Sequence, residues 1–342
     1  MQPSFFDVDQ RHEEISKMGD PLEKLNECIP WDDFLLVLSE LDKKERKSNA
    51  GRKAYPAILM FKIVILQSLY NLSDNKTEYM IRDRLSFMRF LELKMEDKIP
   101  DEKSIWLFRE RLKEAGLIES LFNEFNRFLS NQGFDAKKGQ IIDASIIPVP
   151  KQRNKREENK QIKEGVTPES WKETPNKLRQ KDTDARWTKK HSQNHYGYKN
   201  HINVDAKHKL IREYAVTTAS THDSQCFEEI LDHRNSSKDV YADSAYRSEE
   251  SDQLLKDLEL NNKTHYRSYR NKPLSEHKQQ INKARSTIRV RVEHIFGFMQ
   301  NSMGGKQIRS IGIARARLQL GIRNLTYNLC RYGQLLRIAE AV

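Results

Sequence analysis

The chain has 342 residues, a formal net charge of +11 and a sequence pI of about 9.3. Hydrophobic residues make up 37% of it, which is enough for a sizeable core in one or two domains. The basic excess favours a polyanionic partner, with nucleic acid as the leading candidate. A soluble basic protein without such a partner would have the same composition.

The cysteines and the N-terminal sequence bear on the compartment. The three cysteines are far apart and form no CxxC pair, which argues against a zinc site or a disulfide framework and fits a reducing compartment. The N-terminus carries acidic residues where a signal peptide needs basic and apolar ones, and no stretch approaches the ~20 apolar residues of a membrane span. We therefore expect a cytoplasmic protein without a membrane partner, associated with the nucleoid if it binds DNA.

Residues 1–135 are predicted to form an all-helical domain. Pro56 precedes an apolar segment that indicates a buried helix, and Ser73 and Asp74 are candidate caps of the helix that follows. A further capped helix begins at Asp101 and ends before a glycine. Several short helices joined by tight turns are typical of helix-turn-helix DNA-binding domains, but a helical dimerisation or packing domain fits the pattern equally well.

From residue 136 the pattern changes to that of an α/β domain, which we place at residues 136–342. Residues 140–147 are short and β-branched, as a buried strand should be. The polar, basic stretch at about 151–190 is predicted to be an extended or mobile insertion, or alternatively a solvated loop without a partner.

Strands and helices alternate after this insertion. The predicted elements are paired strands at 195–205 and 209–220, a helix through 226–233 capped by Asp223, a strand at 239–243, a helix at 247–258, a short strand at 264–266 and a helix at 275–299. This order predicts a mixed sheet with helices on its faces.

Three acidic residues stand in contexts that suit metal-dependent phosphodiester chemistry. Asp143 and Asp243 each end an apolar strand, and Glu293 shares a polar helix stripe with Arg289. If the two strands are neighbours, the three carboxylates can hold a pair of hard divalent cations, which prefer oxygen ligands. The alternative is that Glu293 pairs with Arg289 and that each aspartate is an ordinary strand-end residue.

Several blocks of the sequence together resemble bacterial insertion-sequence transposases of the DDE type, specifically the family named after insertion sequence five. These blocks, which span nearly the whole chain, are DPLEKLNECIPWDDF, GRKAYPAILMFKIVILQSLYNLSD, IRDRLSFMRFLEL, IPDEKSIWLFRERL, IIDASIIPVP, HYGYKNHINVD, TTASTHDS, VYADSAYRS and RVRVEHIFGFM. The resemblance implies a ribonuclease H-like catalytic core after a helical domain for DNA binding or dimerisation. It assigns the catalytic, metal-binding triad to Asp143, Asp243 and Glu293.

The resemblance also implies an activity, that of a Mg²⁺-dependent DNA transposase with two ions, for which Mn²⁺ can substitute. One ion would activate a water that attacks the phosphodiester at the element's end, and the other would stabilise the leaving oxygen. The freed 3′-hydroxyl would then be joined to target DNA by transesterification. The implied partners are double-stranded DNA, at the terminal inverted repeats and at the target, and a second copy of the chain, giving a homodimer in the DNA complex.

The block that contains the last acidic residue departs from the family's pattern at two positions. That pattern often reads Tyr, two residues, Arg, three residues, Glu, six residues, Lys. Arg289 and Glu293 match it, whereas Ser286 stands in place of the Tyr and Gln300 in place of the Lys. These two departures leave the acidic ligand in place, but they remove the aromatic ring and the cation of the pattern. Lys306 is a candidate replacement for the cation.

Candidate DNA contacts are basic or aromatic side chains near these motifs. They are Lys199, His201, Arg247, Arg285 and Arg289 as phosphate contacts, and Trp187 as a base-stacking residue. Trp171 and Trp187 both lie in the insertion, where each is expected either to stack on splayed bases or to anchor the insertion. His222 is expected to be a capping or packed residue rather than a catalytic one, and Asp205 to start a turn.

Three other functions stay open. The first is a catalytically inactive or repurposed transposase that still binds DNA, although the complete acidic triad argues against it. The second is a metal-dependent nuclease that cuts without joining, which a strand-transfer assay would separate from a transposase. The third is a basic RNA-binding protein, which the lack of an aromatic-rich RNA motif makes the weakest.

Overall fold

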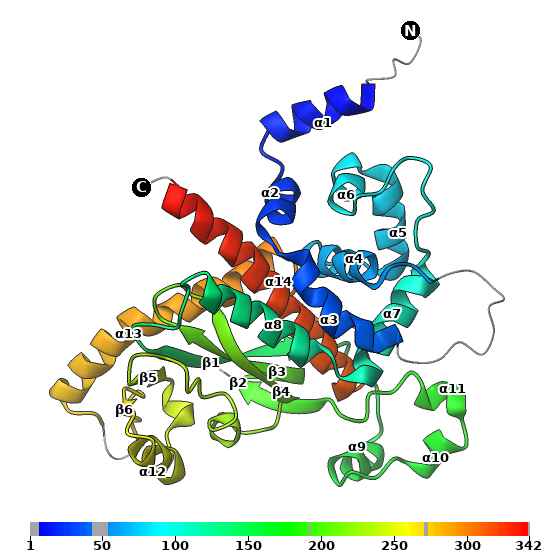
Figure 1. Cartoon of the computed structure of the whole chain (residues 1–342). Coiled ribbons are helices and arrows are strands. Elements are labelled where there is room, and N and C mark those ends of the chain that lie inside the picture. The colour runs from blue at the N-terminus through cyan, green and yellow to red at the C-terminus, as the bar shows by residue number, and fades with distance from the viewer. Residues whose placement is uncertain (1–6, 43–53, 191, 270–272, 341–342) are drawn as a thin grey trace. The chain divides into compact units, whose positions relative to one another are not determined.

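The computed structural model describes residues 7–42, 54–190, 192–269 and 273–340 (Figure 1). The chain forms two compact units, one made of Met1–Phe125 with Ile322–Val342 and the other of Asn126–Gly321.

The first unit is helical in the part that the structure describes, as the sequence predicts for the N-terminal region. Its helices are α1 (Asp7–Lys17), α2 (Pro21–Cys28), α3 (Leu35–Leu38), α4 (Ala57–Leu69), α5 (Asp74–Asp83), α6 (Leu85–Phe90), α7 (Glu102–Ala115), the first part of α8 (Ile118–Asn131) and the last part of α14 (Ile313–Glu340). Short 3-10 turns, Trp31–Phe34 and Ser39–Asp42, flank α3.

Local capping chemistry sets several helix limits in this unit. The Asp101 carboxylate accepts a hydrogen bond from a first-turn N–H of α7 at 2.7 Å, and Gly116 ends that helix with a φ of 65°. Ser73 caps α5 in the same way. Helix α4 is buried along most of its length, and Lys62 within it is paired with Glu92 at 2.5 Å. The predicted buried helix and the cap at Ser73 are confirmed, whereas Asp74 is the first residue of α5 and pairs with Arg109.

The described helices are mostly too short or too polar to span a membrane. None of them by itself is long and apolar enough to cross a membrane, although α4 and α5, bent by 103° at their break, meet the length and composition criteria as a pair.

The second unit is built on a mixed sheet. Its strands are β1 (Gln140–Pro148), β2 (Arg186–Lys190), β3 (Gln193–Asp205), β4 (Ile211–Thr218), β5 (Asp239–Ala242) and β6 (Asn261–Asn262). Its helices are α9 (Arg156–Lys163), α10 (Glu169–Lys172), α11 (Pro175–Leu178), α12 (Glu249–Asp257) and α13 (Glu276–Gly297), with the adjoining parts of α8 and α14. The prediction of a mixed α/β sheet is confirmed.

The strand order places β1 in the middle of the sheet. The hydrogen-bonded path runs β2-β3-β1-β5-β6, and β4 pairs with β3. Strands β1 and β4 are antiparallel to β3, whereas β5 is parallel to β1 and β6 is parallel to β5. Helix α13 packs against β1 and β5. The parallel β1–β5 pair brings two strand ends to the same edge, where functional side chains commonly gather.

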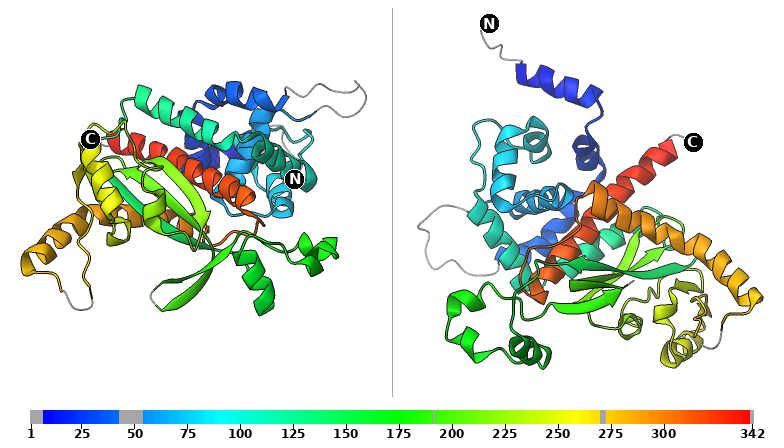
Figure 2. Two further views of the ribbon diagram at one scale, coloured as in Figure 1. Left: turned by 90° about the horizontal axis from the view of Figure 1, so that it is seen from below. Right: turned by 180° about the vertical axis from the view of Figure 1, so that it is seen from behind.

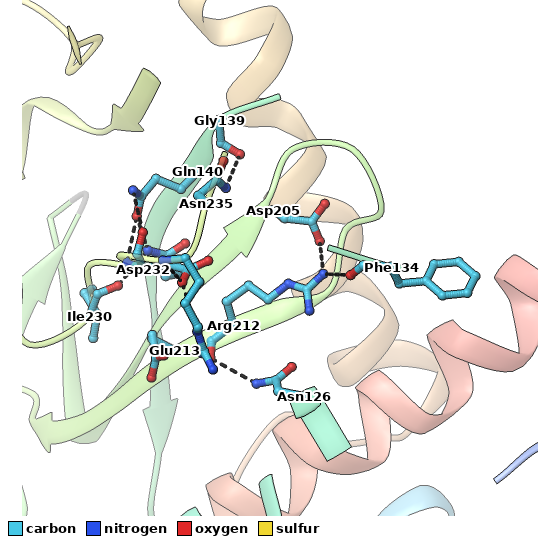
Figure 3. A network of polar contacts seen from close by, with 12 residues as sticks. Asn126, Phe134, Gly139, Gln140, Asp205, Arg212, Glu213, Ile230, Asp232 and Asn235 are labelled. Carbon is cyan, nitrogen blue, oxygen red and sulfur yellow. Dashed lines mark hydrogen bonds and ion pairs between the residues drawn. The ribbon is translucent and has the colours of Figure 1, made fainter. Parts of the chain in front are cut away.

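A buried polar network fixes β5 beside β1 (Figure 3). Gln140, at the start of β1, accepts a hydrogen bond from Asp232 N at 3.0 Å and donates one to Asp232 O at 3.2 Å. Asn235 donates to Gly139 O at 3.1 Å. Gly139 has a φ of +91°, and a Cβ there would lie 2.9 Å from Asp239 O. The close approach of the chain to β5 therefore requires glycine at this position.

The turn between β3 and β4 is organised by a buried aspartate. Asp205 is fully buried and accepts backbone N–H bonds from His208 at 2.6 Å and Leu210 at 3.1 Å. Arg212 contacts the Asp205 carboxylate at 3.5 Å and also donates to Phe134 O (Figure 3). The predicted hairpin and the turn-forming role of Asp205 are confirmed.

The insertion predicted to be extended or mobile is instead folded into the helices α9, α10 and α11. Trp171 is fully buried at its centre and donates its indole N–H to Glu158 at 2.7 Å. Lys177 and Lys181 lie over the Trp171 ring at 5.6 and 5.1 Å. The prediction was wrong because one large aromatic side chain supplies a core that the low apolar content did not reveal. Trp171 therefore packs inside the insertion and is not exposed for stacking on bases.

Two shorter elements also differ from the sequence prediction. A helix was expected through 226–233, capped by Asp223, but the structure has a 3-10 turn at Asp223–Cys226 whose cap is the His222 side chain. A short strand was expected at 264–266, but β6 lies at Asn261–Asn262. In both cases the segment is too short for its local pattern to override tertiary contacts.

Candidate active site

Asp143 and Asp243 lie at equivalent positions on neighbouring strands. The parallel pairing of β1 and β5 ends with Ile142 opposite Ala242, and each aspartate follows directly. The two carboxylates are close enough to interact, since the charge on Asp243 contributes to raising the pKa of Asp143. The structure therefore brings together two of the three predicted acidic residues, and the parallel register is the cause.

Asp143 is held in a confined, polar environment. Its side chain is 14% exposed, and its Oδ2 accepts a hydrogen bond from Arg289 Nη2 at 2.8 Å. Its Oδ1 accepts the N–H of Ala144 at 2.8 Å. Burial raises the pKa of Asp143, while the Arg289 guanidinium opposes that shift. A carboxylate that is costly to ionise and already attracts a cation is a suitable ligand for a metal ion.

Asp243 joins β5 to a short 3-10 turn, Ser244–Tyr246. Its carboxylate accepts the N–H of Ser244, which fixes its orientation. The phenol of Tyr246 is buried behind the pair, and burial, followed by the charges of Asp223, Asp143 and Asp243, raises its pKa well above the ordinary value. An uncharged phenol there adds no further negative charge to the aspartate pair.

Glu293 lies on α13, four residues after Arg289. One turn before it, Arg289 contacts Asp143, and two turns after it, Gln300 donates to Ser145 Oγ at 3.2 Å. Asp143 and Ser145 share one face of β1, since alternate residues of a strand point the same way. Glu293 is exposed, and it is bracketed by two contacts to the face that carries Asp143.

The acidic residues do not form a preassembled metal site in the described part of the chain. No group of three or more His, Cys, Asp or Glu side chains there has metal-binding geometry. The donor set still suits a hard divalent cation, because it consists of carboxylate oxygens and one of them already binds the Arg289 guanidinium. Asp143 and Asp243 would hold such an ion, whereas the structure does not bring the exposed Glu293 into a group with them.

Lys199 is engaged within the protein. Its ammonium donates to Asp223 at 2.7 Å and to Thr221 O at 2.7 Å, and its side chain is 12% exposed. Asp223 thus serves as the partner of Lys199, and His222 caps the following turn with Nδ1. The expected capping role of His222 is confirmed. Since both acceptors hold Lys199, we leave it out of the DNA-binding surface proposed below.

His201 is a buried, neutral hydrogen-bonding group on β3. Its Nε2 lies 2.9 Å from Thr217 Oγ1 and its Nδ1 lies 3.3 Å from the Tyr246 hydroxyl. Burial lowers the pKa of His201 to about 4, although the nearby Asp223 carboxylate favours protonation. The ring is fully buried. We therefore leave His201, too, out of the proposed DNA-binding surface.

The depressed pKa of His201 predicts a stability loss in mild acid. The unfolded residue titrates near 6.5 and the folded one near 4, so the unfolded state binds the extra proton as the pH falls between these values. We expect a loss of about 3 kcal/mol over that interval, and none above it. Urea unfolding at a series of pH values should show this component in the native protein and not in His201→Gln. Equal pH dependence in both proteins would contradict the assignment.

Three cations converge on the ring of Tyr266, and we call this group the Tyr266 cluster. Arg247, Lys278 and Arg285 lie 4.7, 5.2 and 4.9 Å from the ring centroid. Arg247 also contacts Asp252 at 3.5 Å, but its Nη1 has no hydrogen-bond partner among the described residues. Positive charges gathered at one ring repel one another, so an anion such as a phosphate would stabilise the cluster.

The Tyr266 cluster is connected to the aspartate pair through α13. Arg285 donates to Thr264 O, and one turn later Arg289 lies 3.4 Å from His265 Nδ1 and bonds to Asp143. Lys278 and Tyr266 were not among the sequence-predicted site residues. The signal for Tyr266 was an aromatic residue within the basic segment THYRSYR, of which residues 264–266 were interpreted as a short strand.

The two departures from the family pattern have structural partners. Ser286 Oγ donates to Asn282 O at 2.9 Å and lies 3.4 Å from His265 Nε2. Gln300 bonds to Ser145, on the same strand face as Asp143. Gln300 therefore contacts the strand face that carries Asp143, and Ser286 contacts His265, which lies beside Arg289. Trp187, in contrast, lies on β2 with 46% of its surface exposed.

Comparison with known proteins identifies the class. The sequence model of the transposase DDE domain family matches residues 135–329, and that of a transposase domain family (DUF772) matches residues 10–111. The chain belongs to the transposase DDE domain family, and its class is that of the DNA transposases. It is also similar to the solved structure of a piggyBac transposase synaptic complex with hairpin DNA, with 14% identity, 94% coverage of this chain, 76% coverage of that chain and a TM-score of 0.44.

Proposed function

We propose that this transposase mobilises an insertion sequence of the family named after insertion sequence five. In this proposal the second unit is a ribonuclease H-like catalytic core that binds the element's terminal inverted repeats, cleaves the element ends and joins them to target DNA. The observation that carries it is the side-by-side placement of Asp143 and Asp243 at the ends of the parallel strands β1 and β5, with a cationic side chain on Asp143.

The proposed roles follow from the geometry of each side chain. Asp143, Asp243 and Glu293 would hold two Mg²⁺ ions, for which Mn²⁺ would substitute. These ions, when bound, activate the attacking oxygen and stabilise the leaving one. Arg289 neutralises Asp143 in this structure, and with its Nε without a hydrogen-bond partner among the described residues it would contact a phosphate of the substrate. Tyr246 and His201 stay neutral behind the aspartates and preserve their negative charge for the ions.

The Tyr266 cluster is proposed to bind the DNA backbone beside the reacting phosphodiester. Arg247 and Arg285, predicted as phosphate contacts, belong to it together with Lys278. A phosphate held there would position the strand relative to Asp143 without reading its sequence. Because two element ends must be joined to one target, we propose a homodimer in the DNA complex.

The decisive test is an end-cleavage and strand-transfer assay. The purified protein is incubated with labelled double-stranded DNA carrying the candidate element end, a plasmid target, and Mg²⁺ or Mn²⁺. We expect metal-dependent nicking at the end and joining to the plasmid, both absent in Asp243→Ala. Nicking without joining would identify a nuclease, and DNA binding without cleavage under either metal would identify a catalytically inactive binding protein.

A further inference from the structure

Strand β2 and the start of β3 form a two-stranded ribbon that extends beyond the rest of the sheet (Figure 2). The ribbon comprises Arg186–Lys190 paired with Gln193–Gly197. The pairing of β3 with β1 reaches Gly197, and its pairing with β4 reaches Tyr198, so Gln193–His195 have β2 as their strand partner. We call this element the β2–β3 ribbon.

The base of the ribbon is rigidly attached to the second unit. Tyr198 donates its hydroxyl to the buried Asp182 carboxylate at 2.7 Å, and Asp182 also accepts the N–H of Ala185 at 2.9 Å. Gly197 has a φ of +152°, and a Cβ there would lie 2.2 Å from Ile147 O. Arg186 is used internally, since it donates to Thr183 O and Ile162 O. The direction in which the ribbon extends is therefore fixed by the core.

One face of the ribbon combines an exposed aromatic ring with cations. Trp187 is 46% exposed and lies opposite Tyr196, with ring centroids 5.1 Å apart. Lys189 follows on the same face, since alternate residues of a strand share a face, and it is exposed. Lys151 places its ammonium 5.8 Å from the Trp187 ring. Tyr196 is buried, so Trp187 has a firm support on one side and solvent on the other.

The charge of the ribbon itself has a single sign. The sequence contains no Asp or Glu at residues 185–204, while Lys189 and Lys190 are both exposed on β2. A cationic strand pair with an exposed indole complements a phosphate backbone and a base that has left its stack, because stacking requires only an aromatic face and is tolerant of sequence. An apolar protein partner would not match this charge.

We propose that the β2–β3 ribbon contacts the DNA substrate, with Lys189 and Lys190 on phosphates and Trp187 stacked on an unpaired base. This inference rests on the proposed DNA-transposing function, and it adds a contact surface outside the acidic site. The ribbon thereby favours DNA whose pairing is locally disrupted over a fully paired duplex.

The test compares binding to two short fluorescein-labelled DNAs by anisotropy over a range of salt concentrations. One is fully paired, and the other has the same sequence with a central mismatched bubble. We expect the native protein to prefer the bubble, and Trp187→Ala to lose about tenfold of that preference. We expect the double variant Lys189→Ala, Lys190→Ala to lower the salt slope for both DNAs by about one unit per lysine.

Matched controls separate this proposal from the proposed function itself. Trp106→Ala removes an indole of nearly equal exposure, 47%, and should leave the bubble preference unchanged. The double variant Lys238→Ala, Lys256→Ala should leave the salt slope unchanged. If the native protein binds neither DNA, the proposed function fails. If it binds and the ribbon variants match the native protein, or if Trp106→Ala loses the same preference, the ribbon proposal is overturned.

Discussion

Replacing Asp143 with asparagine is expected to abolish both cleavage of the element end and joining to target DNA. The amide has the size of the carboxylate but no negative charge, so it cannot neutralise a divalent ion beside Asp243. We expect a rate loss of at least about a thousandfold, as for other residues that act as a catalytic unit. DNA binding should persist, because the Tyr266 cluster and the ribbon are unchanged. Quantification of nicked and joined products in the presence of Mg²⁺ or Mn²⁺ measures the effect.

A matched control lies on the same strand. Ser145→Ala alters the same face of β1 and removes the hydrogen bond from Gln300, at 3.2 Å, without touching a carboxylate. It should keep most of the activity and a circular dichroism spectrum like that of Asp143→Asn. If Asp143→Asn still cut DNA while Asp243→Ala did not, Asp143 would have to be removed from the catalytic group. If Ser145→Ala were inactive as well, the loss would reflect disruption of this strand face.

Replacing Trp171 with alanine is expected to unfold the three-helix insertion. The indole is fully buried, and its loss leaves a cavity where the helices α9, α10 and α11 meet, at a cost of about 3–5 kcal/mol. The change also removes a hydrogen-bond donor from Glu158. The pKa of Glu158 is lowered to about 2, most strongly by the hydrogen bond from the Lys155 backbone N–H and then by those from Trp171 and Lys177. An insertion of this size buries little other apolar surface that could offset this loss.

Limited proteolysis and hydrogen exchange measure this effect separately from global unfolding. Residues 151–185 should become protease-sensitive in Trp171→Ala, while the β1–β5 pair stays protected. Trp171→Phe keeps an aromatic core and loses the bond to Glu158, so we expect a smaller destabilisation of about 1–2 kcal/mol. Unchanged protection of the insertion in Trp171→Ala would show that the indole does not hold the helices together.

Local chemistry accounts for what could be predicted from the sequence. Asp101, Ser73 and Ser275 each cap the helix that follows, because a short polar side chain satisfies first-turn N–H groups within its own segment. The apolar runs before Asp143 and Asp243 predicted the strands β1 and β5. These signals need no knowledge of distant residues.

The environments of the basic residues could not be predicted in the same way. Lys199 and His201 lie close together in the sequence of β3, yet one is paired with Asp223 and the other is fully buried between Thr217 and Tyr246. Their partners come from segments that reach them only through the sheet register. Arg247 and Arg285 were predicted as separate phosphate contacts, whereas the fold gathers both on the ring of Tyr266.

The sequence by itself determined the transposase class, the helical N-terminal region, the mixed sheet and the three acidic candidates, because motifs and hydrophobic periodicity are properties of neighbouring residues. Only the tertiary structure decided that Asp143 and Asp243 meet, that Arg289 binds Asp143, and that the insertion folds around Trp171. Parallel strand pairing and side-chain burial join segments far apart in the chain, and local sequence carries no record of which segments will meet.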